Sequence, residues 1–101
     1  MDSRRFTSAA ELRAVFNAIV LPRAERGELQ ELVLSSAQAG PASRQPPGTV
    51  SELVGYYEAG LRVAVAHRFV TPDGEMAASG RPDPKEVRMD GELLVLDRRA
   101  T

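Results

Sequence analysis

Cysteine is absent from this chain of 101 residues, which excludes a disulfide scaffold, a thiol nucleophile and every cysteine-based zinc or iron–sulfur site. Aromatic residues make up only 5% of the chain, and none is tryptophan, which argues against a platform of rings for stacking nucleic-acid bases. Thirteen basic residues stand against fourteen acidic ones, whereas nucleic-acid-binding domains usually have a pI above about 9. We therefore expect no nucleic-acid partner.

Long apolar runs are also missing. The longest uncharged stretch, residues 32–43, is rich in serine, alanine, glycine and glutamine, whereas a transmembrane helix needs about 20 mostly apolar residues. No apolar run of the kind found in a secretory signal follows residues 1–7. These absences predict a cytoplasmic protein with no membrane partner.

Residues suited to chemistry are scarce as well. His67 is the only histidine, and so the only side chain whose ordinary pKa lies near neutrality. Neither a phosphate-cradling glycine motif nor the strained serine turn of the α/β-hydrolases occurs. A lone histidine without cysteine cannot form an ordinary structural zinc site. We expect no metal and no cofactor.

The composition that remains is that of a globular domain, with 43% hydrophobic and 27% charged residues. The length predicts a single domain spanning residues 1–101. The patterns divide it into a helical half, residues 1–61, and a strand half, residues 62–98, with a Pro/Gly-rich connecting loop at residues 40–48. We therefore predict an α+β fold in which about three N-terminal helices pack on a small C-terminal antiparallel meander of three to four strands.

Three apolar stripes suggest the helices. The first helix begins with a capping box at Ser8–Glu11, and Pro22 suits the first turn of the second helix. A second capping box, Thr49–Glu52, predicts the start of the third helix, and Gly60 its end. The stripes have helical spacing: Leu12, Val15, Phe16 and Ile19; then Leu29, Leu32, Val33 and Ser36; then Val50, Leu53, Val54, Tyr57 and Leu61.

After residue 61 the apolar period changes from 3.6 to 2, which predicts a strand over residues 62–69. Thr71–Gly74 then has the composition of a turn, followed by a short weak strand at residues 75–79 and a loop stiffened by two prolines at residues 80–85. Asp90 and Gly91 predict a hairpin between residues 87–89 and 92–96.

Three kinds of functional site remain open, and the sequence neither favours nor excludes one of them, a ligand pocket between the helices and the sheet. If the protein is an enzyme, such as a small RNA-cleaving toxin, His67 would act as general acid or base, helped by Arg68, Arg81 and Lys85. The alternative for His67 is a histidine at the edge of the core, because it shares its strand face with apolar residues.

The second kind is a surface that binds a partner, and the balanced charge and poor catalytic inventory favour it. The stiff loop holds Arg81, Asp83 and Lys85 at little entropic cost, and Tyr56 lies beside the third apolar stripe, either as a contact residue or at the boundary of the core. Leu94 and Leu96 belong to a segment that is apolar on both faces, which requires cover from a partner or a central place in the sheet. We predict a non-catalytic interaction protein, such as an inhibitor, immunity protein, antitoxin-like protein or accessory subunit, with a protein partner or as a homodimer.

Overall fold

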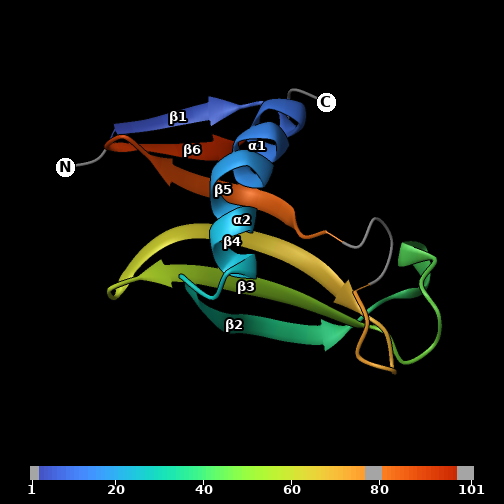
Figure 1. Ribbon diagram of the computed structural model, residues 1–101. Coiled ribbons are helices and arrows are strands. Elements are labelled where there is room, and N and C mark those ends of the chain that lie inside the picture. Colours follow the sequence, from blue (N-terminus) through green and yellow to red (C-terminus); the bar gives the residue numbers. More distant parts are fainter. Residues whose placement is uncertain (1–2, 77–80, 98–101) are drawn as a thin grey trace.

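The chain forms one six-stranded mixed sheet with a single helix lying across one of its faces (Figure 1). The computed structural model describes residues 3–76 and 81–97. The order of strands across the sheet is β1-β6-β5-β4-β3-β2, and only the β1–β6 pair is parallel. The strands are β1 (Ser3–Thr7), β2 (Gln30–Gln38), β3 (Val50–Glu58), β4 (Leu61–Val70), β5 (Asp83–Met89) and β6 (Glu92–Leu96). In this part of the chain, no helix has the length and apolar character needed to cross a membrane.

The helix consists of α1 (Ala9–Val15), the π-helical turn η1 (Phe16–Val20) and α2 (Leu21–Glu25), 17 residues in all. The predicted N-cap is confirmed, since the Ser8 hydroxyl accepts a hydrogen bond from the Glu11 backbone N–H at 3.2 Å. Pro22 has no N–H to donate and lies in the first turn of α2. The wider turn before it lets the chain continue as a helix.

The predicted fold class, three helices in residues 1–61 on a small C-terminal meander, is wrong. The structure has one helix, and strand accounts for 51% of it against 22% for helix. The predicted second helix is helical only around Pro22, in α2, and most of the segment with its apolar stripe is β2. The predicted third helix is β3. The short 3-10 helix η2 (Pro41–Ser43) lies in the predicted loop, and β1, at the N-terminus, was not expected at all.

The third predicted helix failed because β3 lies inside the sheet and carries apolar residues on both faces. Val54 and Tyr56 are buried under the helix, while Leu53 lies on the opposite face. Apolar residues therefore occur next to each other, and this imitates helical spacing. Ala59 and Gly60, with φ of 49° and 83°, form the tight turn into β4 rather than a helix end.

The strand half was predicted more closely. β4 covers the alternating segment, and β5 and β6 form the hairpin around Asp90 and Gly91, both of which have positive φ. The turn after β4 closes with a hydrogen bond of 2.9 Å from the Gly74 N–H to the Thr71 carbonyl oxygen. Of the predicted weak strand only its start is described, as an isolated bridge between Met76 and Val70, and residues 77–79 lie outside the described residues.

The main core lies between the helix and the sheet. Phe16, in the middle of the helix, meets Tyr56 edge-on with ring centroids 5.6 Å apart. The small side chains of Ala64 and Ala66 on β4 leave room for the helix to approach the sheet. The buried cluster comprises Leu12, Phe16, Val20, Leu29, Val54, Tyr56, Ala64, Ala66, Val87 and Leu94.

β6 is not an edge strand, although the apolar run in residues 93–96 left that possibility open. It pairs with β5 on one side and with β1 on the other, and Leu94 lies fully buried in the core. The central place in the sheet therefore explains why this strand is apolar on both faces.

Phe16→Ala is expected to destabilise the protein by about 3–5 kcal/mol, because it empties the contact between the helix and β3. Ile19→Ala, on the same helix but 38% exposed, is the matched control and should cost about 1 kcal/mol or less. Urea denaturation of both variants measures the difference. Equal losses would mean that Phe16 does not anchor the helix.

Candidate functional site

His67 lies on the sheet face opposite the helix, beside Ser51 of the neighbouring strand. The Ser51 hydroxyl and His67 Nε2 are 2.6 Å apart, and the imidazole ring meets Phe69 edge-on at 4.7 Å. Burial lowers the pKa of His67 below its ordinary value, the positive charge of Lys85 lowers it further, and Asp83 partly opposes both effects. The imidazole is therefore largely neutral at pH 7, and in the tautomer with its proton on Nδ1 its Nε2 accepts a hydrogen bond from the Ser51 hydroxyl.

The basic residues expected to assist His67 do not gather around it. Arg68 follows His67 in β4, so its side chain points to the opposite, helix-covered face, where it pairs with Glu52 at 2.9 Å and Glu31 at 3.4 Å. Arg81 lines cavities on that same face. Of these three basic residues, only Lys85 affects the pKa of His67. The Lys85 ammonium lies 3.3 Å from the Asp83 carboxylate.

The residues expected to contact a partner are divided between core and surface. Tyr56 is only 1% exposed, Leu94 is fully buried, and Leu96 packs against the core. In this fold the side chains of Tyr56 and Leu94 are not available to a protein surface. Asp83 and Arg81 are exposed, and Asp83 also lies 3.7 Å from Arg13 of the helix.

Three consecutive exposed apolar residues lie on β2, which the sequence patterns had placed in a helix, whereas Phe6 on β1 and Leu61 on β4 are exposed singly at 61% and 53%. Every residue of β2 is exposed, and Leu32, Val33 and Leu34 have exposed fractions of 44%, 50% and 39%. β2 ends the strand order, so among the described strands it pairs with β3 alone. A β-bulge with Leu34 as the extra residue interrupts the pairing to β3. The signal available in the sequence was three adjacent apolar residues in a segment, 30–38, that contains a single charge.

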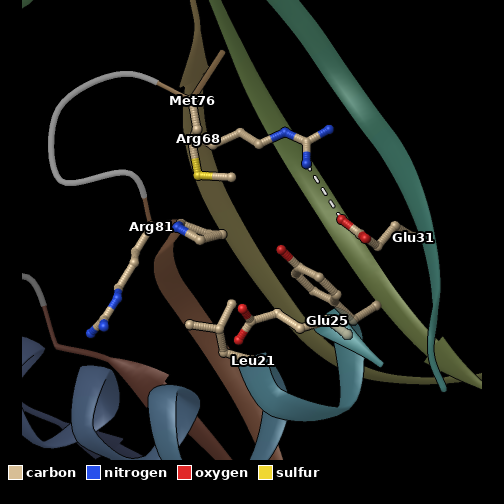
Figure 2. Close-up of a pocket in the computed structure, with 9 residues that line it drawn as sticks. Leu21, Glu25, Glu31, Arg68, Met76 and Arg81 are labelled. Atoms are coloured by element: carbon tan, nitrogen blue, oxygen red, sulfur yellow. Dashed lines mark hydrogen bonds and ion pairs between the residues drawn. The ribbon is translucent and has the colours of Figure 1, made fainter. Parts of the chain in front are cut away.

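A cavity of about 340 Å³ opens on the helix face, between the end of the helix and β2 (Figure 2). Leu21, Ala24, Met76 and Pro82 supply apolar walls, whereas Glu25, Glu31, Tyr56, Arg68 and Arg81 supply polar groups. Burial, and then the negative charge of Glu31, raise the pKa of Tyr56 to about 12 against a smaller opposing effect of Arg68. The phenol in this cavity is therefore neutral at every physiological pH.

Within residues 3–76 and 81–97, no three or more side chains of histidine, aspartate and glutamate are grouped so as to hold a metal ion. Comparison of the chain with protein-family models, with curated proteins and with solved structures found no match.

The depressed pKa of His67 predicts a pH-dependent part of the stability. As the pH falls, His67 takes up a proton in the unfolded chain at about pH 6.5, and in the folded chain only at a lower pH. Protonation therefore favours the unfolded state, and the free energy of unfolding decreases as the pH falls below about 6.5. His67→Gln keeps a polar side chain but does not titrate. We expect the free energy of unfolding of the wild type to fall more steeply than that of His67→Gln between pH 7 and pH 5, measured by urea denaturation. Parallel curves would contradict the lowered pKa.

Proposed function

We propose that the chain is a small, non-catalytic protein-interaction domain, and that it binds through the free edge of β2, which pairs with the same edge of a second copy. The observation that carries the proposal is the uncovered apolar segment Leu32–Leu34 on a sheet edge. An inhibitor, immunity protein, antitoxin-like protein or accessory subunit would each act through a surface of this kind.

A row of apolar side chains on neighbouring strands of the core continues to this edge of the sheet, where nothing in the described structure covers it. Val33 is opposite Val54, which is buried, and Val54 is opposite Ala66, which is also buried. Val33 continues the row but is half exposed because the helix does not extend over β2. Another strand alongside β2 would remove this surface from water and supply the missing backbone hydrogen-bond partners.

The two edges of the sheet differ in how well they resist pairing. β1 has five residues, two of which are arginines, and Arg5 is held by Glu92 at 3.0 Å and Glu11 at 3.3 Å. Charged side chains and short length are the usual devices that keep sheet edges apart. β2 is nine residues long and its only charge is Glu31. This contrast favours β2 as the interacting edge.

The β2 sequence is also self-complementary. In an antiparallel pair related by a two-fold axis at Val33, that residue faces Val33 of the second copy, and Leu32 faces the second copy's Leu34. Glu31 then faces a serine rather than its own twin, so no like charges meet. The bulge next to Val33 limits the length of regular pairing, which makes Leu32–Leu34 the centre of the contact.

The wild-type chain is expected to have twice its 10.9 kDa mass in solution, as measured by size-exclusion chromatography with light scattering. Val33→Lys should convert it to a monomer, because two ammonium groups would meet at the axis. A wild type that stays monomeric at every concentration tested would overturn the proposal.

Two controls make this experiment specific to β2. Leu61→Lys places the same charge on another exposed apolar residue, 53% exposed and away from the β2 edge, and should leave the dimer intact. Mixing Val33→Lys with Val33→Glu should restore a dimer that neither variant forms alone, because opposite charges then meet. Dissociation by Leu61→Lys, or no recovery on mixing, would place the interface elsewhere.

A second candidate function is the small enzyme, and the contact between Ser51 and His67 is the observation that favours it. A neutral imidazole at hydrogen-bond distance from a hydroxyl is the pairing that general-base catalysis requires. Under the interaction proposal, purified protein should degrade RNA no faster than its His67→Ala variant does. RNA cleavage that this substitution abolishes would support the enzyme instead.

A further inference from the structure

The sheet face opposite the helix carries an apolar surface of its own. The helix lies against one face of the sheet (Figure 1), and the strand register places four apolar residues of β3, β4 and β6 on the other: Leu53, Val65, Leu93 and Val95. Val65 is only 4% exposed although it faces away from the helix. Long side chains of the neighbouring strands therefore enclose part of this surface.

A cavity of about 330 Å³ follows these apolar residues across the sheet. Its lining runs from Arg4 on β1 to Leu53 on β3, with β6, β5 and β4 in between. Five neighbouring strands spaced about 4.8 Å apart place its two ends about 19 Å apart across the sheet. The cavity is therefore an elongated groove with an apolar floor.

The charged side chains along the groove leave one cation without a partner. Glu86 pairs with Arg62 at 3.2 Å, and Lys85 pairs with Asp83 at 3.3 Å. Within residues 3–76 and 81–97, the exposed side chain of Arg4 forms no hydrogen bond or ion pair. The β1 end of the groove therefore presents a guanidinium group that is free to bind an anion.

The surface around the groove has the same sign of charge. Strands β1, β4, β5 and β6 place four basic residues on this face against two acidic ones, namely Arg4, Arg62, Lys85 and Arg88 against Asp83 and Glu86. Both acids are already paired with cations. The net positive charge of these strands favours an approaching anion over a cation.

We propose that this groove binds an amphipathic anion, in the form of a carboxylate carried on an unbranched aliphatic chain. The carboxylate accepts hydrogen bonds from the Arg4 guanidinium, and the chain lies over the apolar residues of β6 and β4. The methylene groups of Lys85 and Glu86 flank the chain, because the charged ends of both side chains are held by their ion partners. A volume of about 330 Å³ is at the small end of the range for ligand sites.

Ligands that lack either the charge or the chain fit the groove less well. An amphipathic cation would face Arg4, and the acid that lines the groove, Glu86, is already paired with Arg62. A neutral alcohol would cover the apolar floor but leave Arg4 unpaired. A small anion such as acetate would pair with Arg4 but leave the floor in water. Both parts of the ligand should therefore contribute to binding.

The experiment is a titration of the wild-type protein followed by two-dimensional NMR of its backbone amides. The probe is hexanoate, and the matched comparisons are n-hexylammonium, 1-hexanol and acetate. We expect saturable shifts with hexanoate, centred on residues 4, 53, 65, 85–86 and 93–95, and weaker binding as salt is added. Each methylene added up to octanoate should tighten binding about threefold. The three comparison compounds should bind at least about tenfold more weakly.

Two variants test the two ends of the ligand separately. Arg4→Gln removes an exposed charge that has no partner in the described structure, so it should fold as the wild type does and bind hexanoate about tenfold more weakly. Val95→Thr keeps the shape of the side chain but adds a hydroxyl to the floor, and it should weaken hexanoate and 1-hexanol alike. Arg44→Gln, the matched control, removes another exposed arginine that does not line the groove, and it should bind as the wild type does.

Equal binding of n-hexylammonium, no saturation with hexanoate or octanoate, or unchanged affinity in Arg4→Gln would overturn the anion site. Shifts of these amides that follow the protein concentration instead of hexanoate would assign the face to a second copy of the chain, and would overturn it as well.

The result is independent of the β2 dimer, because the groove does not include β2. The monomeric variant Val33→Lys should bind hexanoate as the wild type does. A monomeric wild type that binds hexanoate would overturn the dimer alone, and a dimer that does not bind it would overturn the groove alone.

Discussion

The structure depends on how much of a wide sheet one helix can cover. The packing of Leu12, Phe16 and Val20 against the sheet joins the two layers, and it begins over β5 and β6 and continues towards β4 and β3. The contacts of the helix with the sheet are mainly to β5, β6 and β4, and the helix ends at Glu25 without extending over β2.

The exposed edge and the cavity are both consequences of this limit. The helix ends at Glu25, and the chain turns at Gly27, which has φ of 74°. It then enters β2, at the edge of the sheet opposite β1. The apolar row of the core continues into Val33 without a helix above it. Beside that row, the last turn of the helix and the Tyr56 ring line a cavity of about 340 Å³ among the described residues. The end of the helix before β2 thus produces both the exposed apolar edge and the cavity.

Local signals in the sequence predicted those parts of the fold that local interactions determine. The Ser8 cap and the Asp90–Gly91 turn are such cases, because each is set by backbone hydrogen bonds or by φ within a few residues. β4 was recognised because its apolar residues alternate.

β2 and β3 were misread because neither has the one-sided burial that produces alternation. β2 is exposed on both faces and β3 has apolar residues on both. β1 gave no signal because its place is fixed by β6, almost ninety residues later in the chain. The same long-range pairing explains the candidate sites: Ser51 meets His67 and Glu31 meets Arg68 only once the register of three strands is known.

Glu31 connects the edge with the cavity. It is the only charged residue of β2, and an isolated charge on an edge strand would ordinarily discourage another strand from pairing there. Arg68, however, lies two strands further in and is itself anchored by Glu52, and it holds the Glu31 carboxylate over the helix face of the sheet (Figure 2). The ion pair thus directs the Glu31 carboxylate towards the cavity and away from the edge of β2 where another strand would form hydrogen bonds. β2 consequently presents an edge that is neutral as well as uncovered, while the same carboxylate raises the pKa of Tyr56.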